Sequence, residues 1–156
     1  MSVAAAVEGW KKWVEPLKGQ VKLGAPGVSN SANAGQGLEW LKQFLSDCKV
    51  DSGALCGVDF VPVHWYGDAG DRAGFQAFVT RASEAGGGRK LWVTEFGTTS
   101  GTAEQTRGFL RDSMVWLDGP GKTMVERYAW FMDRPGNLIN ANGEGLSELG
   151  KLYNSG

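Results

Sequence analysis

The sequence predicts an α/β fold in which about four strand-helix units follow one leading helix. The expected strands are short and nearly continuously apolar, as in LWVTEF, and stripes of leucine and phenylalanine at helical spacing lie between them. Strand centres are roughly 30 to 40 residues apart, which is the length of one βα unit. Because continuously apolar strands that alternate with helices are typical of parallel sheets, we expect a parallel sheet with helices packed on it.

The leading helix is expected over residues 3–17, because Val3, Val7 and Trp10 recur at helical spacing after Ser2, which can cap the helix. Strand, loop and helix then alternate. We expect strands at residues 21–26, 58–66, 91–96 and 125–131, and helices at residues 37–48, 75–85, 104–117 and 146–153.

Pro62 is a misfit inside the expected strand 58–66. Proline has no N–H to donate to a sheet ladder, so it is normally found at strand edges or at bulges. We therefore expect this strand to be bulged or to lie at an edge of the sheet.

Size and composition predict one globular domain over residues 1–156, with 42% hydrophobic and 21% charged residues. The net charge of −1 comes from 16 basic and 17 acidic residues spread along the chain, so no basic stripe is present to bind nucleic acid. No apolar run approaches the roughly 20 residues of a membrane span. The N-terminal lysines follow the apolar residues instead of preceding them, so we expect no signal peptide in this chain.

Functional groups gather where the expected strands end. Glu95 ends one strand and is followed at once by a Gly/Thr/Ser loop. His64 and Tyr66 close another strand, where alternation places these two side chains on one side and Trp65 on the other. The carboxyl ends of parallel strands carry the active sites of (β/α) barrels and of doubly wound sheets. Glu95 is therefore either a catalytic carboxylate or a residue that caps a loop. His64 and Tyr66 either hold a sugar hydroxyl and orient that carboxylate or are structural.

Two further sets of side chains near strand ends leave alternatives open. Trp130 can stack on a pyranose ring or lie in the core, since a buried tryptophan is the commoner case. Asp68, Asp133 and Glu126 are the acids nearest the other strand ends, and none is an obvious partner for Glu95. The loops after the strands lack a Gly-rich dinucleotide motif, which disfavours a Rossmann fold.

The two cysteines, Cys48 and Cys56, flank a short loop. They are either a disulfide or a reduced pair, and they form no metal site without further ligands. His64 is the only histidine, so a zinc site or a Ser-His-Asp triad has little to be built from. We expect no metal and no cofactor.

Four ordered motifs, VDFVPVHWYG, LWVTEFG, VERYAWF and the closing NLINANGEGLSELGKLYNSG, resemble the fungal catalytic domains of glycoside hydrolase family 128, which act on β-1,3-glucans. The resemblance extends over essentially the whole chain. It implies a (β/α)₈ barrel and a retaining mechanism, with Glu95 as nucleophile and Cys48–Cys56 as a disulfide. It also implies a sugar site lined by His64, Tyr66 and Trp130.

The family's acid/base glutamate lies in an Asn-Glu-Pro motif, which this sequence lacks. A full barrel takes ~250 residues, so 156 residues supply at most about five of its eight units. We therefore expect the C-terminal half of a TIM-type barrel, truncated at its N-terminus. Open barrel edges predict self-association, which a monomer at every concentration in light scattering would contradict.

The expected function is that of a retaining β-1,3-glucan hydrolase lineage whose acid/base glutamate is missing from this chain. The alternative is a non-catalytic module that binds β-glucan in a cell wall. The resemblance implies an extracellular or cell-wall location, although no signal peptide is visible.

Overall fold

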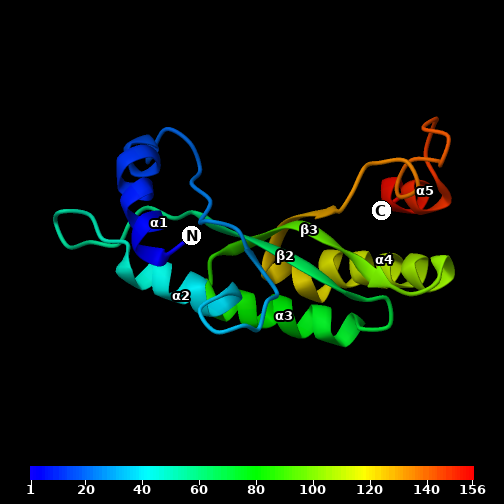
Figure 1. Cartoon of the computed structure of the whole chain (residues 1–156), viewed down its shortest axis with the longest axis horizontal. Helices are drawn as coiled ribbons and strands as arrows, with labels where there is room; N and C mark the ends of the chain where they lie inside the picture. Colours follow the sequence, from blue (N-terminus) through cyan, green and yellow to red (C-terminus); the bar gives the residue numbers. More distant parts are fainter.

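The computed structural model describes residues 1–156 and contains one parallel sheet with strand order β1-β2-β3-β4 (Figure 1). The strands are β1 (Val28–Ser29), β2 (Phe60–Asp68), β3 (Lys90–Ser100) and β4 (Val125–Trp130). The α-helices are α1 (Val3–Gly9), α2 (Gly37–Asp47), α3 (Arg72–Ala85), α4 (Ala103–Asp118) and α5 (Glu148–Asn154). Four sequential parallel strands are half of an eight-stranded barrel, which confirms the predicted fold class.

The two faces of the sheet differ in what covers them. Helices α2, α3 and α4 lie along one face, where alternate residues of the central strands, such as Val61, Val63 and Leu91, are fully buried (Figure 1). No helix covers the opposite face, on which the intervening residues of β2 are only partly buried. None of the helices is both long enough and apolar enough to span a membrane.

The expected strand at residues 21–26 is wrong in its bounds. Only the isolated bridge Gly24–Phe60 pairs that segment with β2, and the assigned strand begins at Val28, which pairs with Val63. Between these two pairs the first segment has residues 25–27 and the second only residues 61–62, so the ladder is interrupted. Pro62, which has no N–H, falls in this interruption although β2 is an interior strand.

The leading helical segment keeps the expected bounds but changes its type. It begins as α1, continues as the π-helical η1 (Trp10–Val14) and ends as the 3₁₀-helical η2 (Glu15–Leu17). Ser2 caps it by accepting a hydrogen bond from the N–H of Ala5. A further 3₁₀ turn, η3 (Pro120–Thr123), precedes β4.

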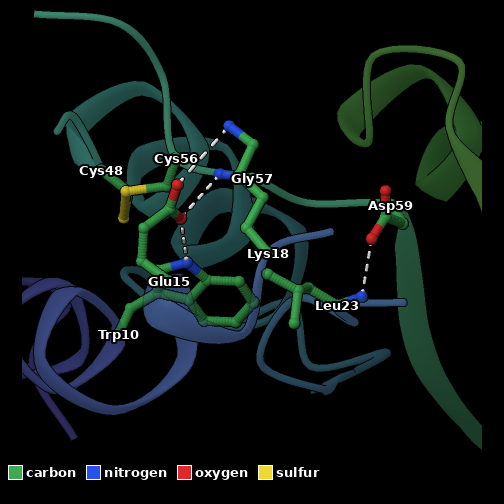
Figure 2. Close-up of polar contacts among 8 residues, drawn as sticks. All are labelled: Trp10, Glu15, Lys18, Leu23, Cys48, Cys56, Gly57 and Asp59. Carbon is green, nitrogen blue, oxygen red and sulfur yellow. Dashed lines mark hydrogen bonds and ion pairs between the residues drawn. A yellow bond between two sulfur atoms is a disulfide. The ribbon is translucent and has the colours of Figure 1, made fainter. Parts of the chain in front are cut away.

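A polar clamp around Glu15 ties this segment to the loop before β2 (Figure 2). Glu15 Oε2 accepts hydrogen bonds from Trp10 Nε1 at 3.1 Å and from the Gly57 N–H at 2.8 Å. Next to Gly57, a disulfide joins Cys56 to Cys48, whose Cα atoms lie 5.4 Å apart. The Glu15 side chain is only 14% exposed, so both donors depend on one largely buried carboxylate.

Aromatic and charged side chains stabilise the uncovered face at the end where the strands begin. Phe60 and Trp92 stack with their centroids 3.8 Å apart, and the Arg127 guanidinium lies 4.6 Å from the Trp92 ring. Glu126 accepts hydrogen bonds from Trp92 Nε1 and Lys22 Nζ, which lower the pKa of its carboxyl group. We call Lys22, Phe60, Trp92, Glu126 and Arg127 the lower-face cluster.

The two edges of the sheet differ in how open they are. At β4 the Tyr153 hydroxyl of α5 lies 3.4 Å from both the Trp130 N–H and the Tyr128 carbonyl oxygen, so this edge is partly occupied. At β1 a cavity of about 540 Å³ borders Val28 and Ser29. Self-association through these edges stays a prediction.

Replacing Glu15 with alanine should lower the free energy of unfolding by about 1–3 kcal/mol, because two partly buried donors would lose their acceptor. Glu8→Ala is the matched control on α1, since the Glu8 side chain is exposed and makes no hydrogen bond. The control should change the free energy by less than about 0.5 kcal/mol. Urea denaturation measures both, and equal effects of the two substitutions would contradict the role given to the clamp.

Candidate functional site

Strands β2 and β3 bring His64, Tyr66 and Glu95 together near their carboxyl ends. Val63 pairs with Val93, but the next pair is His64 with Glu95, so Thr94 is an extra residue in β3. An extra residue of this kind is a β-bulge, and it shifts the side chains that follow it to the other face. Glu95 therefore lies on the uncovered face beside His64 and Tyr66.

One oxygen of Glu95 faces both neighbours. The Tyr66 hydroxyl donates to Glu95 Oε2 at 2.6 Å, and His64 Nδ1 lies 3.6 Å from the same oxygen. Oε1 accepts no hydrogen bond and makes no ion pair. The side chains of His64 and Glu95 are 30% and 31% exposed, so the group can be reached from the uncovered face.

Tyr66 is held as a neutral donor at this site. Burial, the hydrogen bond to Glu95 and the charge of Glu95 together raise the pKa of the Tyr66 hydroxyl well above its usual value of 10.0. The cause is physical, since a phenolate beside a carboxylate would place two negative charges within hydrogen-bonding distance. Tyr66 therefore keeps its proton across the neutral pH range, and its hydroxyl donates a hydrogen bond to Glu95.

The structure corrects the position expected for Trp130. Trp130 is 6% exposed and packs against Phe96 with ring centroids 5.2 Å apart, while its Nε1 donates to Asn137 at 2.9 Å. It also borders a separate cavity of about 360 Å³ lined by Asn137 and other residues. Trp130 is thus a core residue and not an open wall beside Glu95.

Two residues that sequence reasoning missed support the site. Phe131, the next residue after β4, is 38% exposed and meets Tyr66 edge-on at 5.8 Å between centroids. Asn30 lies just past β1 and bonds to the backbone of Tyr66. A polar residue after a strand was a weak signal for Asn30. Nothing in the sequence distinguished Phe131 from its aromatic neighbour Trp130 as the more exposed of the two.

The other candidate acids do not join Glu95. Asp68 accepts hydrogen bonds from the Ser100 hydroxyl and the Gly70 N–H, which lower the pKa of its carboxyl group. Glu126 belongs to the lower-face cluster at the opposite end of the strands, and Asp133 is exposed and makes no hydrogen bond or ion pair. The arrangement is thus a single carboxylate with one hydrogen-bond donor and a neighbouring imidazole, without a second carboxylate in contact.

No group of three or more histidine, cysteine, aspartate or glutamate side chains is arranged to hold a metal ion. Glu95, His64 and Tyr66 form a partly exposed polar group on the uncovered face. A carboxylate with one free oxygen can attack an electrophilic carbon, and the hydroxyl and imidazole can hold neighbouring hydroxyl groups.

Comparisons with known proteins point to one family. Residues 1–153 match the family described as glycosyl hydrolase catalytic core. No curated protein matches the chain. Among solved structures, the chain is similar to a family 128 (subgroup III) curdlan-specific exo-β-1,3-glucanase from Blastomyces gilchristii, in complex with glucose, at 35% identity and a TM-score of 0.83. That match covers 98% of this chain and 62% of the relative.

Two endo-β-1,3-glucanases of family 128 are also similar. The Lentinula edodes enzyme (subgroup IV) is 29% identical with a TM-score of 0.80, covering 97% of this chain and 63% of that one. The Amycolatopsis mediterranei enzyme (subgroup I), solved with laminaripentaose, is 28% identical with a TM-score of 0.75, covering 98% and 64%. The chain therefore spans a little less than two thirds of the length of these relatives.

Tyr66→Phe should make the protein's stability less sensitive to alkaline pH. Because the folded-state pKa of Tyr66 is raised above 10.0, the unfolded chain loses this proton first, and stability falls as pH rises through and beyond 10.0. Phenylalanine removes this contribution but keeps the ring. Urea denaturation at neutral pH and at several pH values above 10.0 measures the slope. Part of the slope should remain, because the pKa of Tyr128 is also raised. An unchanged slope would contradict the assignment.

Proposed function

Because the chain belongs to the glycosyl hydrolase catalytic core family, with family 128 β-1,3-glucanases as structural relatives, we propose that it carries the nucleophile side of a retaining β-1,3-glucan hydrolase site. The observation that carries the proposal is the state of Glu95, whose Oε2 accepts a hydrogen bond from the Tyr66 hydroxyl while Oε1 accepts none. One fixed and one free oxygen suit a carboxylate that must attack along a single direction.

In the proposed first step, Glu95 Oε1 attacks the anomeric carbon of a glucosyl unit. A covalent bond forms between that carbon and Oε1, and the bond from the carbon to the glycosidic oxygen breaks. The hydrogen bond from Tyr66 orients the carboxylate and stabilises its negative charge before attack. His64, 3.6 Å from Oε2, is placed to hold a sugar hydroxyl beside the reacting carbon.

The departing glycosidic oxygen needs a proton from a second carboxyl group roughly 5–5.5 Å from the nucleophile, and that group later activates water. No other carboxylate contacts Glu95, Tyr66 or His64. We propose that the acid/base group is not among the residues of this chain and reaches Glu95 from the uncovered face of the sheet. The chain alone should then hydrolyse natural glucan slowly or not at all.

We propose Phe131, in place of Trp130, as the aromatic surface beside the sugar. Phe131 is partly exposed and contacts Tyr66, whose hydroxyl reaches Glu95. A partly exposed aromatic ring next to polar groups suits a pyranose, which has apolar C–H faces and hydroxyl edges. An extracellular or cell-wall location is proposed with it, since the Cys48–Cys56 disulfide suits an oxidising compartment.

A glycosyl donor with a good leaving group tests the nucleophile without needing the acid. 2-Deoxy-2-fluoro-β-laminaribiosyl fluoride should transfer its sugar to Glu95, because fluoride departs without protonation and the 2-fluoro group slows release of the covalent ester. Mass spectrometry of the intact chain should show one added 2-deoxy-2-fluorolaminaribiosyl unit, and peptide mapping should place it on Glu95. Glu95→Gln should abolish labelling.

Glu126→Gln is the matched control, because Glu126 lies on the same uncovered face but in the lower-face cluster. This variant should be labelled at the wild-type rate. Labelling of another carboxylate would overturn the assignment of Glu95. Binding of laminari-oligosaccharides without any labelling would favour the non-catalytic glucan-binding alternative.

Phe131→Ala and Trp130→Ala should separate sugar contact from core packing. Phe131→Ala should reduce affinity for laminaripentaose, measured by calorimetry, by roughly 5- to 50-fold, because an aromatic-sugar contact is lost, with little change in melting temperature. Trp130→Ala should instead lower the free energy of unfolding by about 3–5 kcal/mol, because it empties a core position. A Phe131 variant that binds normally would contradict the proposed surface.

A further inference from the structure

The side chain of Asn30 takes the place of a backbone partner for Tyr66. Asn30 Nδ2 donates to the Tyr66 carbonyl oxygen at 2.9 Å, and the Tyr66 N–H donates to Asn30 Oδ1 at 3.2 Å. A primary amide carries an N–H donor and a carbonyl acceptor side by side on one edge, so it can pair with both the C=O and the N–H of a single residue. Asn30 therefore pairs with both backbone groups of Tyr66, as a strand residue would.

The contact between Asn30 and Tyr66 lies just beyond the point where the backbone pairing of β1 with β2 ends. The last pair between β1 and β2 is Ser29 with His64, since β1 has only two residues. Without Asn30, the side of Tyr66 that faces β1 would have no partner from the protein. Unpaired backbone groups in a partly buried position are costly, so the amide fixes where the Tyr66 backbone lies.

The other sides of Tyr66 leave its ring little freedom. Gly97, the residue paired with Tyr66 in β3, lies beside the ring: a Cβ there would be in ordinary contact with the Tyr66 ring at 3.6 Å and tightly against the Phe131 carbonyl oxygen at 3.1 Å. Phe131 meets the ring from β4. A Tyr66 backbone fixed by Asn30 therefore fixes the hydroxyl that reaches Glu95 Oε2.

We propose that Asn30 is a positioning residue that holds Tyr66, and through Tyr66 the Glu95 carboxylate, in the geometry needed for attack. The catalytic part of this inference rests on the proposed function. The structural part does not, because the contact between Asn30 and Tyr66 exists whatever reaction the site performs. A displacement of about 1 Å in such a chain of contacts can cost roughly 100-fold in rate.

Asn33 offers a matched control in the same loop. Its side chain is exposed and makes no hydrogen bond, whereas the Asn30 side chain makes two. Asn30→Ala and Asn33→Ala therefore remove the same amide group from one loop, and only the first removes contacts to Tyr66. A difference between these two variants cannot come from the loss of an asparagine as such.

Nitration of tyrosine tests the contact directly, with no need for catalysis. Tetranitromethane attacks the phenolate, so a raised pKa slows the reaction of Tyr66. In Asn30→Ala at mildly alkaline pH, Tyr66 should be nitrated several-fold faster, because a displaced hydroxyl loses its bond to Glu95. Peptide mapping gives the rates of Tyr66, Tyr128 and Tyr153 in one sample, so the last two report any general loosening of the fold.

The trapping experiment with the laminaribiosyl fluoride tests the catalytic part. Asn30→Ala should be labelled on Glu95 roughly 10- to 100-fold more slowly than wild type, and Asn33→Ala at the wild-type rate. In a Glu95→Gln background, Asn30→Ala should increase Tyr66 nitration less than in wild type, because the carboxylate that it acts through is gone.

The outcomes separate this inference from the proposed function. Unchanged Tyr66 nitration in Asn30→Ala, or an equal increase at all three tyrosines, overturns the inference whether or not Glu95 is trapped. Faster nitration with unchanged trapping also overturns it, since Asn30 would then hold Tyr66 without serving Glu95. An unlabelled wild-type chain overturns the proposed function, and with it the catalytic role of Asn30.

Discussion

The extra residue in β3 decides which face of the sheet Glu95 occupies. If the register set by the Val63–Val93 pair continued unbroken, Thr94 would pair with His64 and Glu95 with Trp65, whose side chain is buried under the helices. A carboxylate there would be removed from water without an ion-pair partner, which is costly. The bulge at Thr94 instead places Glu95 opposite His64, where it is partly exposed and within reach of Tyr66.

The same bulge builds the core beneath the site. Since Phe96 follows Glu95, the shift turns Phe96 into the helix-covered layer, where it is fully buried. There it stacks on Phe75 of α3 with centroids 5.4 Å apart and meets Trp130 of β4. The site and this aromatic core are therefore products of one irregularity, so a change that removed the bulge would disturb both.

Much of this could be predicted from the sequence, because the relevant signals are local. Continuous apolar runs and helical stripes predicted the order of strands and helices, and the strand ends predicted that His64, Tyr66 and Glu95 would meet. The first strand was expected too early in the chain, because Val21 and Leu23 lie in an apolar run of the kind that strands have. Its actual position depends on hydrogen bonds from the backbone of β2, and the regular pairing begins only after Pro62, which has no N–H to donate. Trp130 was misjudged for a similar reason. The face of the sheet on which Trp130 packs is the face that Phe96 occupies, and the bulge in β3 decides that face.

The two ends of the uncovered face differ in whether their carboxylates have a full set of hydrogen-bond partners. In the lower-face cluster, both carboxylate oxygens of Glu126 accept hydrogen bonds, one from Trp92 and one from Lys22, so this carboxylate needs no further hydrogen-bond donor. At the other end Glu95 has one hydrogen-bond donor, one neighbouring imidazole and a second oxygen that accepts no hydrogen bond. Retaining hydrolysis needs a second carboxyl group roughly 5–5.5 Å from the first. Since the helices cover the opposite face, the proposed mechanism leaves the uncovered face as the side from which both that group and the glucan reach Glu95.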